Sequence, residues 1–411
     1  MKKYYIGLMI TSLLAGCAVG TGQQDIGSAA ADTHTSTQVG LSKNEKASEK
    51  STLNIMFADS EQRNFDEKEQ VAIHQILINS DNKVRELLPS LTQDISVNIK
   101  MVDRDLNAVG GVTGRADTPN MVIIEISNSF PGGITNAIDT ALASTVFHEF
   151  HHLVRGWTMQ ENKFGPGIPI AAVNEGLATV FSEKYAGKVS NWTDYPANVE
   201  QWVLEILELP SNAPYSHWMM DVLPDGRSNI GYRTGRFIIH QALANSGKSV
   251  IELTDISPHE ILELSGLIDN HAPSLAKLGD HFATNNSTDK AIVNYQKAYE
   301  LAKIKDNTQA NVYLNKIELL NNPVVISEAV LASYAGRYES EKFKFEITKQ
   351  DGQLIGTMPG RPAFKLIAED QNTFTIRVAP VKFEFQKDST SQIVKLVFHA
   401  NNSAFEVAKV N

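Results

Sequence analysis

The most constraining feature of the sequence is a short histidine motif inside an apolar segment, Ala141–Trp157. The segment reads ALASTVFHEFHHLVRGW and contains His148, Glu149 and His152 in the order H-E-x-x-H. Residues four apart on an α-helix lie one above the other on the same face, so the two imidazoles can reach one ion together. A catalytic zinc accepts neutral imidazole nitrogen and keeps one position open for water or substrate. We therefore predict a zinc-binding helix on which Glu149 is the general base.

The surrounding residues predict this helix independently of the motif. No Pro or Gly interrupts 141–155, and Gly156 is placed to end the helix. Asp139 or Thr140 could cap its start. Apolar side chains recur at helical spacing and give the helix a face for burial; these are Val146, Phe147, Phe150, Leu153 and Val154.

His151 leaves an alternative open, because His148 and His151 at i, i+3 also share a helical face. We prefer the i, i+4 pair with His152, since it leaves Glu149 where a general base is needed. His151 is then expected to support the site or lie at the surface. The simpler interpretation is a surface helix that is rich in histidine and binds no metal.

A catalytic zinc normally has three protein ligands, so a third is expected downstream. The next helical stretch, 170–185, carries Glu175, which follows His152 by 23 residues. Small residues beside it, Gly176 and Ala178, would let this helix approach the first one closely. Glu183 is the competing carboxylate, and Glu175 could instead be a solvated residue near the helix start. The intervening loop is marked by Gly165, Pro166, Gly167 and Pro169.

The block from His148 to Arg155, followed by Asn174-Glu175-Gly176-Leu177-Ala178, resembles a family of predicted zinc-dependent proteases. These are bacterial proteins catalogued as a domain of unknown function. The block is also similar to the gluzincins, in which a Glu on the following helix completes H-E-x-x-H. The resemblance covers about 53–264 and implies a zincin-like fold, one catalytic zinc ion and a peptide or protein substrate. Thermolysin-like gluzincins carry an Asp one turn after the third ligand, where this chain has Thr179.

A peptidase also needs a hydrogen-bond donor for the oxyanion that develops at the scissile carbonyl. The stretch 230–244 is predicted to be a helix and contains Tyr232 in the sequence Gly-Tyr-Arg-Thr-Gly. The resembled family carries a Tyr in a similar context, which implies this role for Tyr232. His240 and His217 are the alternatives.

The N-terminus predicts a secreted, lipid-anchored protein. Lys2 and Lys3 precede a short apolar run, and Leu-Ala-Gly-Cys ending at Cys17 matches a bacterial lipoprotein processing box. We expect residues 1–16 to be a signal peptide and Cys17, the only cysteine, to be lipidated. Residues 17–50 have the composition of a flexible tether. The expected location is the bacterial cell envelope, at the outer membrane or periplasmic face if the cell has two membranes.

Charge and glycine pattern exclude two classes of partner. The formal net charge is −10 and no basic cluster occurs, so nucleic acid is not an expected partner. The segment Gly110–Gly114 is expected to be rich in turns. It lacks the G-K-[ST] ending of a phosphate loop and precedes a strand, so no nucleotide is expected. We expect the chain to act as a monomer.

The residues before the motif alternate between helix and strand. A helix is predicted at 67–88 and strands at 95–102 and 121–126. A strand at the edge of such a sheet can pair with an extended substrate. Met121–Ser127 is the candidate for this edge strand, with a plain core strand as the alternative.

After 185 the chain becomes helical and then β. Five aromatic residues between 192 and 218 are expected to fill the core of a helical lobe or to line a cleft. The stretch 289–320 is predicted to be a helical hairpin, and short alternating runs from Ser327 onward predict a β-sandwich or small barrel, similar to lipocalin-like accessory domains. The aromatic set is Trp192, Tyr195, Trp202, Tyr215 and Trp218.

These observations predict an α+β chain with three folded parts: a zincin-like metallopeptidase domain at 51–283, a helical spacer at 284–324 and a β domain at 325–411. The expected function is a membrane-anchored zinc metallopeptidase outside the cytoplasm. The alternative is a non-catalytic, zinc-containing envelope lipoprotein, whose closed site His151 or Glu183 would complete. Hydrolysis of a non-protein amide, such as a cell-wall peptide link, would use the same metal chemistry.

Overall fold

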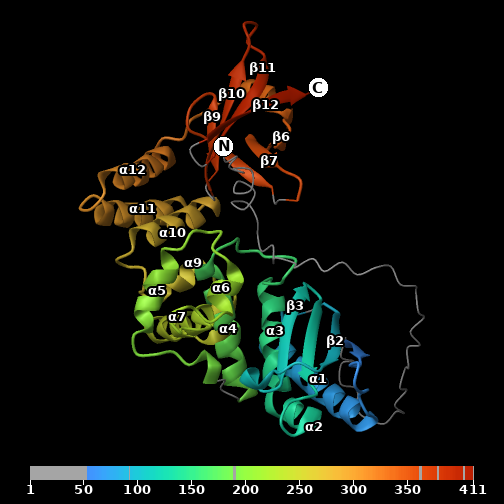
Figure 1. The fold of residues 1–411 in the computed structure, drawn as a ribbon. Helices are drawn as coiled ribbons and strands as arrows, with labels where there is room; N and C mark the ends of the chain where they lie inside the picture. Colours follow the sequence, from blue (N-terminus) through green and yellow to red (C-terminus); the bar gives the residue numbers. More distant parts are fainter. Residues whose placement is uncertain are drawn as a thin grey trace, which may run out of the picture.

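The computed structural model describes residues 53–91, 93–187, 191–360, 363–376, 379–400 and 403–410. The predicted signal peptide, Cys17 and the predicted tether lie outside these residues. The fold is α+β, as expected: a small sheet with helices packed on it, a helical lobe, and a C-terminal antiparallel barrel (Figure 1). Within the described residues, no helix has both the length and the apolar character that crossing a bilayer requires.

The N-terminal sheet has the strand order β1-β2-β4-β3. β1, β2 and β4 are parallel to one another, whereas β3 runs antiparallel to β4. The prediction that Met121–Ser127 is the edge strand is therefore wrong, because this strand is β4 and β3 lies outside it. Glycines made the β3 region look like a turn in the sequence. The strands are β1 (Leu53–Ala58), β2 (Ile95–Val102), β3 (Val112–Thr118) and β4 (Met121–Ser127).

The predicted motif helix is α3 (Ala143–Arg155), and it packs with α1 (Glu67–Leu87) against this sheet. Gly156 ends α3 in the left-handed conformation, with φ +67°, as predicted. The predicted caps Asp139 and Thr140 are wrong. The chain is already helical before them, in α2 (Gly133–Ala137) and a π-helical turn, η3 (Ile138–Leu142), so both residues lie inside a continuous helical run.

A helical lobe follows, and its first helix, α4, lies between α3 and α7. Pro169 belongs to the first turn of α4 rather than to the preceding loop. Gly176 brings α4 close to α7, not to α3 as predicted, because a Cβ on Gly176 would clash with the backbone of Gly235. The helices are α4 (Ile168–Ala186), η4 (Asn191–Thr193), α5 (Val199–Leu207), α6 (Tyr215–Met219), α7 (Ile230–Ser246), α8 (Val250–Thr254), α9 (Pro258–Leu264) and α10 (Ala272–Thr284).

The predicted helical hairpin is present as α11 (Thr288–Ala302) and α12 (Asn307–Asn321). It packs on α10, and its buried tyrosines, Tyr295 and Tyr313, belong to the same apolar core as the helical lobe and the sheet.

The N-terminal part also contains a short helix, η2 (Asn107–Val109), between β2 and β3.

The C-terminal β region is a closed barrel that follows a short helix, α13 (Glu328–Tyr334). The predicted β region from Ser327 onward thus begins with a helix, which ends at Tyr334. The barrel interior is a second apolar cluster, rich in phenylalanine and separate from the first. The strands are β5 (Gly336–Glu339), β6 (Lys344–Gln350), β7 (Gln353–Thr357), β8 (Phe364–Ala368), β9 (Thr373–Ile376), β10 (Ala379–Lys387), β11 (Ile393–Ala400) and β12 (Ser403–Val410).

Candidate metal centre

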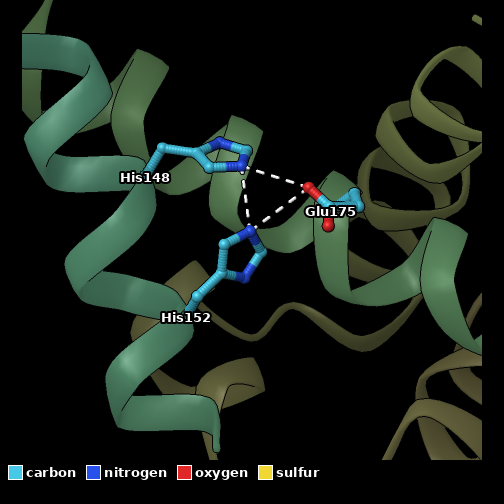
Figure 2. Close-up of side chains that lie close together, drawn as sticks. All are labelled: His148, His152 and Glu175. Atoms are coloured by element: carbon cyan, nitrogen blue, oxygen red, sulfur yellow. Dashed lines mark hydrogen bonds and ion pairs between the residues drawn. The ribbon is translucent and has the colours of Figure 1, made fainter. Parts of the chain in front are cut away.

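Two histidines of α3 and one glutamate of α4 point toward a common centre (Figure 2). The Nε2 atoms of His148 and His152 are 3.0 Å apart. Each of them lies 3.2 Å from Oε2 of Glu175. The structure thus brings the three predicted ligands together, and they form a group of donor atoms that could hold one metal ion.

The spacing of these three atoms fits zinc. A tetrahedral zinc ion with bonds of about 2.0–2.1 Å holds its ligand atoms about 3.3 Å apart. The observed separations of 3.0–3.2 Å are close to this value. Two imidazole nitrogens and one carboxylate oxygen are also a donor set that catalytic zinc uses, and they leave a fourth position open.

The second oxygen of Glu175 is held by two aromatic side chains. Oε1 accepts hydrogen bonds from Nε1 of Trp157 at 3.0 Å and from the hydroxyl of Tyr215 at 3.2 Å. Burial raises the pKa of Glu175, but His152 and His148 outweigh burial and hold the pKa well below its usual range. Glu175 is therefore an ionised carboxylate fixed in one orientation.

Glu149 lies next to the same centre, against the edge strand β3. Its side chain is buried and packs on Gly114, where an added Cβ would lie 2.6 Å from Cγ of Glu149. Burial raises the pKa of Glu149 to about 7, while His148 lowers it, Glu175 raises it and a hydrogen bond from the backbone of Ala116 lowers it. A carboxylate of this pKa can accept and release a proton near neutral pH.

Tyr232 of α7 also reaches the centre. Its hydroxyl interacts with Glu175 and Tyr215, and its ring lies 4.7 Å from that of Trp192. Burial, followed by the charges of Glu175 and Glu149, raises the pKa of Tyr232 well above its usual value. The hydroxyl therefore keeps its proton and can donate a hydrogen bond.

The two alternatives to Tyr232 have other surroundings. Nδ1 of His240 lies 2.9 Å from the hydroxyl of Tyr195. His217 is exposed and packs against the ring of Trp218. Of the three candidates for the oxyanion donor, Tyr232 is the one that hydrogen-bonds to a predicted metal ligand, Glu175.

The competing ligands are engaged elsewhere. His151 is fully buried, not at the surface, and its Nε2 lies 3.1 Å from Oγ1 of Thr254. Glu183 pairs with Nε of Arg236 at 3.0 Å. Among the described residues, neither joins the group formed by the two imidazoles and Glu175.

A buried arginine connects the two helices that carry the three donor residues. Nε and Nη2 of Arg155 donate to Oδ1 of Asn174, at 3.2 and 2.9 Å, and Asn174 is the residue before Glu175. Nη1 of Arg155 donates at 2.6 Å to the carbonyl oxygens of Thr254 and Ile256. This network fixes α3 against α4, and no sequence motif predicted it.

The position of Thr179 remains a departure from the thermolysin-like pattern. Thr179 is buried in α4 and offers no carboxylate. In the described part of the chain, Nδ1 of His152 has no hydrogen-bond partner. On its Nδ1 side this imidazole therefore has no carboxylate partner, whereas its Nε2 lies beside Glu175.

A mixed helix-and-sheet fold that brings two histidines and a glutamate together around one centre defines a candidate zinc protein. Residues 74–263 match the model of a family described as "Predicted Zn-dependent protease (DUF2268)". The matched region contains all three donor residues, Glu149 and Tyr232, and it ends before the hairpin and the barrel. The match supports this family and, with it, a zinc peptidase. A comparison with curated proteins finds no match.

Proposed function

We propose that this chain is a zinc metallopeptidase that hydrolyses peptide bonds in peptide or protein substrates. The observation that carries the proposal is the convergence of His148, His152 and Glu175 beside a buried carboxylate, Glu149. Zinc bound there would polarise the scissile carbonyl and lower the pKa of a water to around 7. The family match supports the same reaction class.

Each side chain of this centre has a separate role in the proposed hydrolysis. Glu149 takes a proton from the attacking water and passes it to the leaving amine. Tyr232, which keeps its hydroxyl proton, donates a hydrogen bond to the developing oxyanion. Trp157 and Tyr215 hold Glu175 in place, so that its Oε2 faces the imidazoles.

The edge strand β3 offers a place for the substrate backbone. Gly114 of β3 lies against Glu149, and its lack of a side chain leaves room for that carboxylate. An extended peptide adding to the free edge of β3 would bring a peptide bond next to the general base. This assigns to β3 the role that the sequence suggested for β4.

The decisive experiment is the substitution of Glu149. Glu149→Gln should still bind one zinc ion per chain, but its kcat should fall about 10²–10⁴-fold, the usual contribution of a general base. His152→Ala should lose zinc and activity together, whereas Glu183→Gln, outside the cluster, should keep both. Zinc content by elemental analysis and cleavage of a peptide library measure the two properties. Full activity in Glu149→Gln would exclude this mechanism.

The alternative, a non-catalytic zinc protein of the envelope, requires a fourth protein ligand. The two residues that could supply it, His151 and Glu183, are bonded to Thr254 and Arg236 instead. The open fourth position therefore favours catalysis. Adding cell-wall peptides to the library would test the third possibility, cleavage of a non-protein amide.

Membrane attachment is a second part of the proposal and rests on the sequence alone. The Leu-Ala-Gly-Cys box at Cys17 supports cleavage after residue 16 and acylation of the cysteine. The protein would then act in the bacterial cell envelope on a tether formed by residues 17–50. Mass spectrometry of the N-terminal peptide should show acyl chains on Cys17, and Cys17→Ser should move the protein from the membrane fraction to the soluble fraction.

A further inference from the structure

The outer edge of β3 is partly covered by the chain's own residues just after α3. The amide of Met159 donates to the carbonyl oxygen of Ala116 at 2.9 Å. The amide of Gln160 donates to the carbonyl oxygen of Asp117 at 3.1 Å. The segment 158–160, which we call the edge segment, therefore occupies the C-terminal end of β3, where a substrate strand would otherwise pair.

The register of β3 shows which backbone N–H and C=O groups on its outer edge the edge segment does not cover. The amide of Ser127 in β4 donates to the carbonyl oxygen of Gly111 at 2.8 Å, so the backbone groups of Gly111 face β4. Along an antiparallel strand the backbone groups of successive residues face its two neighbours in turn. Val112, Gly114 and Ala116 face outward. The carbonyl of Ala116 binds Met159 and its amide binds Glu149. Val112 and Gly114 thus carry the outward-facing groups that the edge segment does not cover.

The general base fixes where the scissile bond lies along this edge. Glu149 packs on Gly114 and is hydrogen-bonded by Ala116, so its carboxylate lies at the boundary between the open and the covered parts of β3. A peptide bond presented to Glu149 must therefore lie beside Gly114. Substrate residues on one side of that bond would run along Val112, and those on the other side would meet the edge segment.

The edge segment is held too firmly to be a loose flap. Thr158 is buried, its amide donates to the carbonyl oxygen of Glu161 at 2.9 Å, and its Oγ1 accepts from the amide of Glu161 at 3.1 Å. The preceding residue, Trp157, is bonded to Glu175. Displacing the segment would break these contacts and disturb Glu175.

We propose that the edge segment limits how many substrate residues can precede the scissile bond. This inference rests on the proposed peptidase function. Antiparallel addition is the more stable pairing, and it places the amino-terminal side of the substrate next to Ala116. At about 3.3 Å per residue, no more than about two residues fit between Glu149 and the edge segment. The substrate class is therefore peptides cleaved close to the amino end, with free extension on the carboxyl side.

The test uses the full zinc-loaded chain and peptides that share one cleavable core. One series is lengthened before the scissile bond and the other after it, and cleavage positions are read by mass spectrometry. We expect kcat/KM to fall about tenfold or more once more than about two residues precede the bond, the effect of losing a pair of backbone hydrogen bonds. Lengthening after the bond should leave kcat/KM unchanged or raise it.

Two variants of Met159 test whether the edge segment sets the limit on the number of residues before the scissile bond. Met159→Pro removes the amide that binds Ala116 and should relax the limit on the amino side, whereas Met159→Ala keeps the amide and should keep the limit. Gln160→Pro, which removes the second hydrogen bond, serves if Met159→Pro does not fold. Efficient cleavage of bonds far from both ends by the wild-type chain would overturn the inference while leaving the peptidase intact. No cleavage of any peptide by the zinc-loaded chain would overturn the peptidase function and this inference with it.

Discussion

The indole nitrogen of Trp157 donates a hydrogen bond to Oε1 of Glu175 at 3.0 Å, which leaves Oε2 facing the imidazoles of His148 and His152. Trp157 follows Gly156, the residue that ends the metal helix, so the turn after the helix places the indole over the third donor residue. One short segment, from His148 to Trp157, thus contributes two donor side chains and orients the third. Loss of a hydrogen-bond partner of a metal ligand typically lowers metal affinity about 10–100-fold.

Removing the indole hydrogen bond should weaken zinc binding without unfolding the protein. Trp157→Phe keeps an aromatic ring but no N–H, and we expect the zinc Kd to rise about 10–100-fold. Tyr215→Phe should act in the same direction, because it removes the second donor to Oε1. Trp218→Phe, on the same short helix as Tyr215, is the control and should leave the Kd unchanged. Competition with a chromophoric chelator measures all three, and an unchanged Kd in Trp157→Phe would contradict the assigned role of the indole.

Widening the contact between α4 and α7 should disturb the fold and the centre together. A Cβ on Gly235 would clash with the carbonyl of Ala172 in α4, the helix that carries Glu175. We expect Gly235→Ala to lower the free energy of unfolding by about 1–3 kcal/mol, as overpacking of a tight contact does. Ala244→Ser, at an exposed position of the same helix, should change it by less than about 0.5 kcal/mol. Chemical denaturation measures both, and equal stability of the two variants would show that the helices can separate without cost.

His259 should make the fold less stable in acid. Burial, followed by the charges of His281 and Lys277 on α10, lowers the pKa of His259 to about 3. In the unfolded chain its pKa is about 6.5, so between these values only the unfolded chain binds the proton. The free energy of unfolding should therefore decrease as the pH falls below about 6.5, by up to about 1.4 kcal/mol per pH unit from this group.

The measurement is urea unfolding of matched variants at pH 7.5 and pH 5.5. His259→Asn should show a smaller loss of stability between the two pH values than the wild-type chain. His74→Asn, at an exposed position of α1, should behave like the wild type. An identical loss in His259→Asn and the wild type would assign the acid sensitivity to other groups.

The barrel should be dispensable for the metal centre. The apolar core of the sheet and helices ends at Ile317, and the barrel core begins at Leu331 as a separate cluster. A cavity of about 1280 Å³ lies between the two parts and is lined by residues of both. A chain ending at Asn322 should therefore fold, unfold in one cooperative transition and bind zinc with an unchanged Kd. Loss of zinc binding in the folded, shortened chain would show that the barrel supports the centre.

The sequence predicts the parts of the centre that depend on local geometry. His148 and His152 are four apart on a helix, so their shared face follows from the helical repeat. Glu175 could be predicted as the third donor because it follows His152 by 23 residues and lies on the next predicted helix. The site was thus predictable where one helix, or two consecutive helices, decide the position of the side chain.

The remaining features depend on packing between distant segments, which no spacing in the sequence encodes. Tyr215 reaches Glu175 across 40 residues, and it was noted only as one of several aromatic residues. Gly176 was recognised as a point of close approach, but its partner is Gly235 of α7, which no local pattern identifies. Gly114 suggested a turn, although it lies in a strand where Glu149 fills the space that a side chain would occupy.

The barrel at the C-terminus has one further consequence if the chain is the peptidase proposed above. In the described part of the chain each of its strands has a paired neighbour on both sides, so the barrel has no edge strand. A cleft that binds its substrate by pairing with an extended, unpaired segment finds no edge strand to pair with on this barrel. Closure of the barrel would thus protect this domain from cleavage by the proposed peptidase.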